Sequence, residues 1–144
     1  MLTKSIVIAA DHAGLTLKTE LAHELGRRGF RVIDLGTDGE ASVDYPDYAE
    51  ALARRIEAGD AERGVLICGS GIGMSIAANR HREVRAALCR DVESARLARR
   101  HNDANVLVLG GRVTPLDEAT ACLDAFLETL FEGGRHARRV AKLA

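Results

Sequence analysis

Residues 64–75, which read GVLICGSGIGMS, decide the fold predicted for this chain. The first five form an apolar run, which is typical of a strand buried on both faces of a parallel sheet. Glycines then occupy alternate positions, Gly69, Gly71 and Gly73, and a helical pattern begins at Ile72. The stretch therefore predicts a buried strand, a glycine-rich turn and a helix, the repeating unit of an α/β protein.

The same alternation of short apolar strands and amphipathic helices runs through the rest of the chain. Further strands are expected at residues 5–10, 31–35, 84–89 and 106–109. The expected helices are one with Leu17, Leu21 and Leu25 on its face and Gly29 at its end, one over residues 48–56, one over 72–79, one capped by Asp91, and a long one that Thr114 caps, Pro115 opens and Gly133 and Gly134 end. This order predicts an α/β fold, a three-layer α/β/α sandwich around a Rossmann-like five-stranded parallel sheet.

The overall charge argues against two classes of partner. The 144 residues carry a net charge of -1 and are only 3% aromatic, with no Trp. Such a chain has no broad attraction for nucleic acid or an anionic membrane, and it lacks aromatic platforms for stacking single strands. We expect one domain over residues 1–144 that ends in a basic helical tail, which on composition alone is a solvated surface.

The cysteines indicate free thiols in a reducing compartment. Cys68, Cys89 and Cys122 are odd in number, far apart, and form no Cys-x-x-Cys pair. Neither a disulfide framework nor a zinc site is therefore indicated. The apolar run at residues 6–10 is too short for a signal segment or a membrane span, so a cytoplasmic protein is expected.

Residues that can do chemistry follow the ends of the predicted strands, where parallel sheets bind their ligands. Asp11 and His12 follow the first strand, and Arg112 follows the fifth. Tyr45 lies in the segment after the second strand. On this pattern alone, Asp11 fits a helix cap in a polar turn as well as it fits a catalytic acid.

Cys68 stands where the third strand meets the glycine-rich turn. A helix that follows such a turn directs backbone N–H groups toward an anion and favours a thiolate nearby. A buried structural cysteine is the usual alternative, but this position favours a functional thiol. Met74 excludes three known motifs, because a Walker loop, a dinucleotide fingerprint and a cysteine-phosphatase loop would need Lys, Gly and Arg respectively at that position.

His101 lies where the fourth predicted helix runs into the fifth strand. A lone histidine in such a place is more often structural than catalytic. Together with the strand-end residues, however, it would bring a thiol, imidazoles, carboxylates, a phenol and arginines to one sheet edge. That set suits proton transfer on a small phosphorylated carbonyl compound.

Taken together, these residues resemble the type B ribose-5-phosphate isomerase family, which includes the galactose-6-phosphate isomerase subunits. The matching stretches are residues 10–14 (ADHAG), 44–46 (DYP), 67–79 (ICGSGIGMSIAAN), 100–103 (RHND), 110–112 (GGR) and 132–136 (EGGRH). They occur in the family's order and cover essentially the whole chain. Ser70 stands where many relatives have Thr, and because the thiol is present the chain resembles the members that use Cys rather than Glu as base.

The resemblance implies an aldose–ketose isomerase that needs no metal and no organic cofactor. It implies catalytic roles for Cys68 as the base between C1 and C2, His101 in ring opening, and Asp11 and Ser70 at the hydroxyl protons. Substrate or phosphate contacts are implied for His12, Tyr45, Gly69, Gly71, Gly73, Asn102, Arg112, Arg135 and Arg139. The basic tail then becomes a phosphate clamp, in a homodimer with shared active sites or a tetramer built from two such dimers.

The resemblance leaves the sugar open. Ribose 5-phosphate, converted to ribulose 5-phosphate through an enediolate, is the first expectation. Allose 6-phosphate, galactose 6-phosphate and a tetrose phosphate are alternatives. Two other classes of function also fit the residues, a non-catalytic sugar-phosphate sensor and a Cys–His hydrolase.

Overall fold

A five-stranded parallel sheet forms the centre of the structure, a computed structural model that describes residues 4–144. The strand order is β2-β1-β3-β5-β4. The strands are β1 (Ser5–Ala10), β2 (Arg31–Asp34), β3 (Arg63–Cys68), β4 (Ala86–Leu88) and β5 (Val106–Gly110). The helices are a short 3-10 turn (His12–Gly14), α1 (Leu15–Arg27), α2 (Tyr45–Glu57), α3 (Ile72–Ala78), α4 (Val92–Asn102), α5 (Leu116–Glu128) and α6 (Arg135–Ala141).

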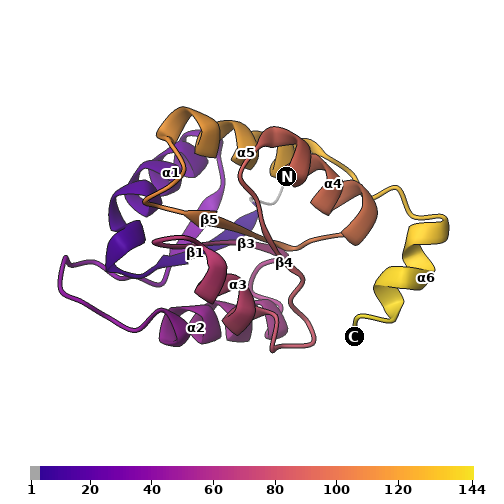
Figure 1. Cartoon of the computed structure of the whole chain (residues 1–144), viewed down its shortest axis with the longest axis horizontal. Coiled ribbons are helices and arrows are strands. Elements are labelled where there is room, and N and C mark those ends of the chain that lie inside the picture. The colour runs from indigo at the N-terminus through magenta and orange to yellow at the C-terminus, as the bar shows by residue number, and fades with distance from the viewer. Residues whose placement is uncertain (1–3) are drawn as a thin grey trace.

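Helices cover both faces of the sheet (Figure 1). On one face α1, α4 and α5 pack over a core that includes Leu21, Leu107 and Phe126. On the other face α2 and α3 pack over a second core that includes Leu52 and Met74. The predicted three-layer α/β/α sandwich is therefore confirmed.

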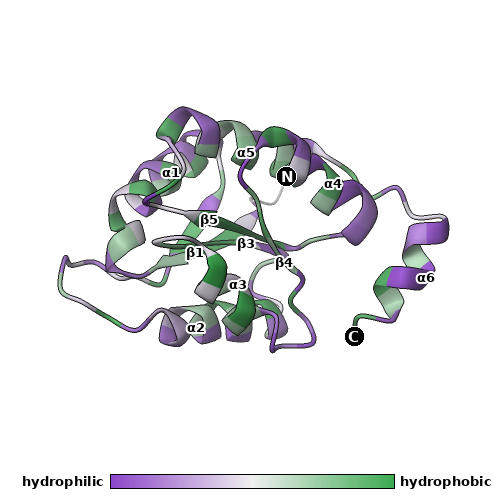
Figure 2. Ribbon diagram, in the orientation of Figure 1, coloured by the Kyte–Doolittle hydropathy of each residue, from purple (hydrophilic) through white to green (hydrophobic). Residues whose placement is uncertain are grey.

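Hydropathy follows the same layers, with hydrophobic strands between helices whose outer faces are hydrophilic (Figure 2). Among the helices of residues 4–144, none combines the length and the apolar composition needed to cross a bilayer.

The predicted strands agree with the observed ones to within two residues at either end. The predicted cap of α4 is also confirmed, because the Asp91 carboxylate accepts a hydrogen bond of 2.7 Å from the N–H of Ser94. Helix α2 begins at Tyr45, three residues earlier than predicted, because Pro46 suits the first turn of a helix.

Both predicted ends of α5 are wrong. The helix is capped by Pro115 rather than Thr114, whose N–H donates to the carbonyl of Gly110 in the preceding turn. It stops at Glu128 instead of continuing to Gly133, and Leu130 beyond it is 79% exposed.

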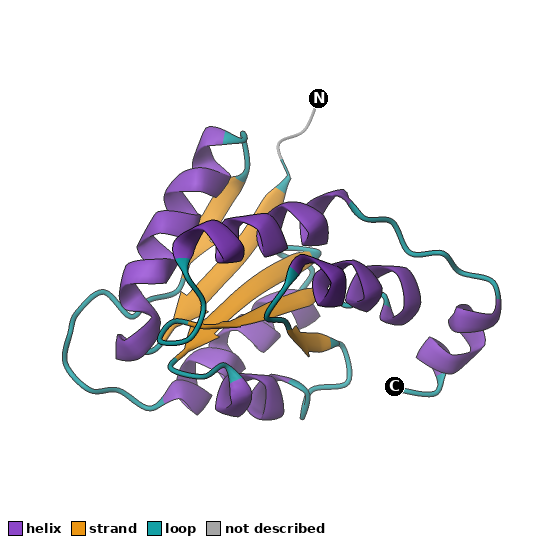
Figure 3. Ribbon diagram, turned by 45° about the horizontal axis from the view of Figure 1, so that its top comes forward, coloured by secondary structure: helices purple, strands orange, loops and turns teal. Residues whose placement is uncertain are grey.

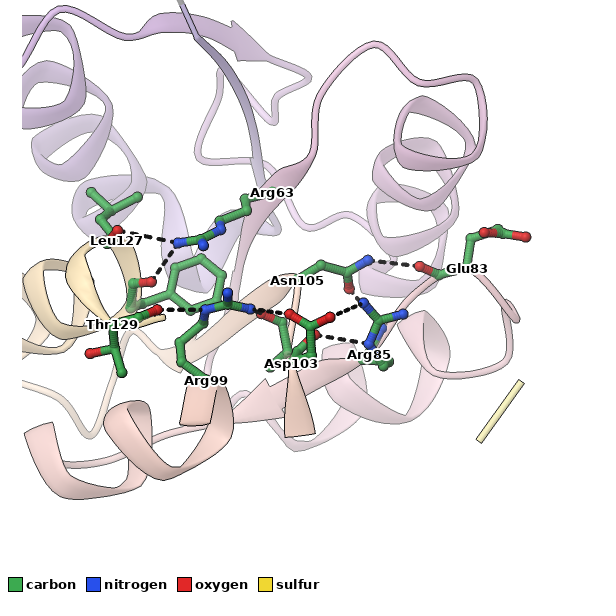
Figure 4. Close-up of polar contacts among 10 residues, drawn as sticks. Arg63, Glu83, Arg85, Arg99, Asp103, Asn105, Leu127 and Thr129 are labelled. Atoms are coloured by element: carbon green, nitrogen blue, oxygen red, sulfur yellow. Dashed lines mark hydrogen bonds and ion pairs between the residues drawn. The ribbon is translucent and has the colours of Figure 1, made fainter. Parts of the chain in front are cut away.

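Two arginines from elsewhere in the chain explain why α5 stops early (Figure 4). The Arg63 guanidinium donates to the carbonyl of Phe126 at 2.7 Å, and Arg99 Nε donates to the carbonyl of Thr129 at 3.1 Å. Arg99 also binds the carbonyl of Ala104 at 2.7 Å and the carboxylate of Asp103 at 2.9 Å. These side chains satisfy carbonyls that a further helical turn would otherwise bind.

The last helix, α6, stands apart from the sandwich (Figures 1 and 3). An extended segment leads to it from the end of α5, and α6 packs beside α4 rather than on the sheet. The predicted basic helical tail is thus present, but most of it projects from the body of the chain.

We predict that Arg99→Ala lowers the free energy of unfolding by about 2–3 kcal/mol, because the change leaves two carbonyls without their donor and removes one partner of the half-buried Asp103 carboxylate. Urea denaturation measures the loss. Arg96→Ala is the matched control, since Arg96 is an exposed residue of the same helix and should change stability by less than about 0.5 kcal/mol. Equal effects of the two substitutions would show that the network does not stabilise the fold.

Candidate active site

An open hollow of about 620 Å³ lies at the carboxyl ends of the central strands. It is where the topology of a parallel sheet predicts a ligand. Its lining residues are Asp11, Tyr45, Cys68, Gly69, Ser70, Ile72, Gly73, Ile76, Arg112 and Val113. Most of the residues that the sequence analysis selected at strand ends therefore share one hollow.

Cys68 is the last residue of β3 and is 5% exposed. Its carbonyl accepts a hydrogen bond of 2.7 Å from the N–H of Gly111, which follows β5. Pairing with β5 and this hydrogen bond together fix the backbone of Cys68. The thiol is thus held in a defined place in the wall of the hollow.

Asp11 and His12 leave the end of β1 in a tight turn. One carboxylate oxygen of Asp11 accepts hydrogen bonds from the N–H groups of Ala13 and Gly14, at 3.0 and 3.2 Å. The helix-cap interpretation of Asp11 is therefore confirmed, and its catalytic role stays a prediction. His12 Nδ1 accepts a hydrogen bond of 3.2 Å from the N–H of Val43, so the neutral ring carries its proton on Nε2.

The glycine-rich turn after β3 allows close packing on both of its sides. Gly71 has a φ of 84°, a backbone conformation that residues other than glycine rarely adopt. A Cβ on Gly73 would lie 2.4 Å from the ring of Tyr45, so glycine is needed for the phenol to approach α3.

Two polar side chains lie beside this turn. Ser70 Oγ accepts a hydrogen bond of 3.2 Å from the N–H of Ile72. The Arg112 guanidinium lies over Gly69, where a Cβ would be 3.2 Å from its Nη1.

A second group of predicted site residues lies at the amino ends of the strands, opposite the hollow. His101 and Asn102 end α4, just before β5 begins at Val106, whereas Cys68 is aligned with Gly110 at the end of β5. Four residue steps along a strand separate these levels by about 13 Å. Arg135 and Arg139 are on α6, beside α4 (Figure 1).

The expectation that all these groups meet at one sheet edge of a single chain is therefore wrong. A helix that follows a parallel strand runs back toward the amino ends of the strands, so the last residues of α4 lie far from the glycine-rich turn. His101, Asn102, Arg135 and Arg139 do not line the hollow that contains Cys68.

Two residues near His101 were missed as site candidates. The His136 ring stacks on the His101 ring, with centroids 4.3 Å apart and planes 11° from parallel. Glu132 Oε1 lies 3.8 Å from His101 Nε2 and 3.5 Å from His136 Nε2. The sequence signal was the stretch at residues 132–136, in which only the arginine was given a role.

Burial lowers the pKa of His136, and the positive charges of His101 and Arg135 lower it further. Within residues 4–144, His101, Glu132 and His136 are also the one group of His, Cys, Asp and Glu side chains close enough to hold a metal ion, with ligand atoms within 4.8 Å of one another. The expectation that no metal is used stays a prediction.

Known proteins match this chain over nearly its whole length. A sequence model described as Ribose/Galactose Isomerase matches residues 6–143. Ribose-5-phosphate isomerase B of Escherichia coli is 46% identical over 137 residues, which are 95% of this chain and 92% of that protein.

Solved structures give the same result. A ribose 5-phosphate isomerase from Thermotoga maritima superposes with a TM-score of 0.95 at 51% identity, over 97% of both chains. Ribose-5-phosphate isomerase B from Mycoplasma genitalium, solved with bound ribulose-5-phosphate, superposes with a TM-score of 0.94 at 43% identity, over 99% of this chain and 95% of the other. The sequence and the fold thus agree that this chain belongs to the ribose/galactose isomerase family.

Proposed function

We propose that this protein interconverts ribose 5-phosphate and ribulose 5-phosphate through an enediolate, with Cys68 as the base. The observation that carries the proposal is the thiol at the end of β3, in a hollow that also presents Asp11, Ser70 and Arg112. A relative of the same fold was solved with bound ribulose-5-phosphate, which supports this choice of sugar. The reaction needs no metal and no organic cofactor.

The chemistry requires a proton to move between adjacent carbons. The Cys68 thiolate takes the proton from C2, the electrons move toward the C1 carbonyl, and the same thiol returns a proton to C1. A positioned base contributes roughly 10²–10⁴ in rate. Asp11 and Ser70 exchange the hydroxyl protons at C1 and C2, and backbone N–H groups of the glycine-rich turn stabilise the enediolate oxygen.

The phosphate is bound at a distance from the reacting carbons. Arg112 lines the hollow, and His12 follows Asp11 in the turn after β1. The Nε2 proton of His12 is the one available for donation, because Nδ1 accepts a hydrogen bond from the N–H of Val43. Arg135 and Arg139 supply further guanidinium groups, which recognise phosphate oxygens in pairs. Tyr45 sets one wall of the sugar pocket through its contact with Gly73.

A second copy of the chain completes each site. His101, Asn102 and the α6 arginines do not line the hollow that contains Cys68, and His101 and Asn102 lie at the opposite end of the strands. Helix α6 projects outward, where another copy can receive it. The rim of the hollow is also apolar and exposed, with Ile72, Ile76 and Val113 exposed by 50%, 55% and 52%. Burying such a rim favours association, so we propose a homodimer with shared active sites, alone or paired into a tetramer.

The three cysteines are free thiols, which suits a cytoplasmic enzyme of carbohydrate metabolism, in the pentose phosphate pathway.

Proton NMR in heavy water tests the reaction and the sugar together. Ribose 5-phosphate should give ribulose 5-phosphate with solvent deuterium at the exchanged carbon, and faster than allose 6-phosphate, galactose 6-phosphate or erythrose 4-phosphate is converted. A faster reaction with another of these sugars would replace the substrate but keep the mechanism. Absence of exchange with all of them, together with binding, would instead favour a sugar-phosphate sensor.

Cys68→Ala should lower turnover by at least about 10²-fold, because the reaction loses its base, while isothermal titration still detects binding of the sugar phosphate. Cys122→Ala is the matched control, since Cys122 is buried in α5 and faces the core on the other side of the sheet from α3. Full activity in Cys68→Ala would exclude the thiol as the base.

Mixing two inactive variants tests the shared site. Cys68→Ala and Arg139→Ala each disable both sites of a homodimer, but a mixed dimer contains one site with neither substitution. Random reassociation of equal amounts should therefore restore about a quarter of the wild-type activity. Failure to restore activity, with subunit exchange verified by mass spectrometry, would show that each site is built from one chain.

A further inference from the structure

The cluster of His101, Glu132 and His136 lies outside the hollow, and the family resemblance gives a role only to His101. We propose that Glu132 and His136 are positioning residues that hold the His101 ring in one tautomer and one plane for opening the sugar ring. This inference rests on the proposed function, together with the ring-opening role that the family resemblance implies for His101.

Glu132 is fixed next to His101 by its own backbone. Its N–H donates a hydrogen bond of 3.1 Å to the carbonyl of Arg100, the residue before His101. Its carboxylate then faces Nε2 of His101 at 3.8 Å. A carboxylate only accepts hydrogen bonds, so it favours the tautomer that carries the proton on Nε2 and leaves Nδ1 as the proton acceptor. This separation is longer than a hydrogen bond, and catalytic hydrogen bonds often tighten only when the substrate binds.

His136 fixes the plane of the ring. Its ring lies parallel to that of His101, and its side chain is 10% exposed, against 40% for His101. Burial, then the charges of His101, Arg135 and Arg139, lower the pKa of His136, and Glu132 opposes them. His136 is therefore neutral at neutral pH, and it packs on the face of His101 without adding a second positive charge.

The ring geometry favours positioning over metal binding by the same three side chains. The lone pairs of two ring nitrogens lie in their ring planes, and these planes are only 11° from parallel. A bound zinc ion requires lone pairs that converge on one point in a tetrahedral arrangement. In the stacked rings, the lone pairs lie in two nearly parallel planes instead.

With the ring held in this way, His101 moves one proton during ring opening. Nδ1 takes the proton of the C1 hydroxyl, the bond between C1 and the ring oxygen breaks, and the electron pair of that bond goes to the ring oxygen. The proton is then returned from Nδ1 to the ring oxygen, which becomes the C4 hydroxyl. The product is the open-chain aldehyde on which Cys68 acts.

Ribulose 5-phosphate allows the two steps to be measured separately. Its C5 oxygen carries the phosphate, so this ketose cannot close a five-membered ring and reaches Cys68 without ring opening. Deuterium uptake at C1 of ribulose 5-phosphate therefore reports proton transfer alone. Turnover of ribose 5-phosphate, which is mostly cyclic, reports ring opening as well.

Glu132→Gln should lower turnover of ribose 5-phosphate by roughly 10-fold to 100-fold and change deuterium uptake from ribulose 5-phosphate by less than about twofold. His101→Asn should give the same selective loss. His136→Ala should reproduce it in weaker form, and His136→Phe should recover most of the activity because a flat ring again packs on His101. Glu128→Gln is the matched control, since Glu128 is an exposed carboxylate at the end of α5.

Equal losses in the two reactions would mean that Glu132 only anchors α6, and no loss in either would mean that it does not act on His101; both results would overturn the inference. A wild-type protein with neither reaction would refute the proposed function first, and the inference with it.

Discussion

Backbone hydrogen bonds between the turns that end β1, β3 and β5 hold the candidate site together. Asp11 N–H binds the carbonyl of Ile67, Gly111 N–H binds that of Cys68, and Arg112 N–H binds that of Gly69. These three bonds fix the positions of the turns, and with them the side chains that line the hollow from the turns. Because these bonds involve only main-chain atoms, they leave the thiol of Cys68 and the guanidinium of Arg112 available for a substrate.

The sheet and the starts of α3 and α4 could be predicted from the sequence because their signals are local. The apolar runs at β1, β3 and β5 and the Asp91 cap each act within a few residues. The end of α5 could not be predicted in this way. It depends on Arg63 and Arg99, which lie about 63 and 30 residues before the carbonyls that they bind.

The candidate site divides along the same line. Asp11, Cys68 and Arg112 lie at or just beyond the carboxyl ends of strands, so the rule for parallel sheets was sufficient to bring them together. His101 lies in the last turn of α4, before β5 begins. Its selection by residue type and motif did not reveal that it lies at the amino ends of the strands. The direction of the chain through α4 would have placed His101 apart from Cys68. A crossover helix between parallel strands returns the chain to their amino ends, and His101 is near the end of that helix.

The position of α6 outside the sandwich has a consequence for how activity depends on protein concentration. Arg135 and Arg139 belong to the part of the chain that projects from the sandwich, and α6 contacts α4 rather than the sheet. The sheet and the thiol therefore do not need α6 for their packing. Under the shared-site arrangement, a single folded chain has the base but lacks the arginines that bind phosphate for it, so activity requires two chains to meet and is lost on dilution.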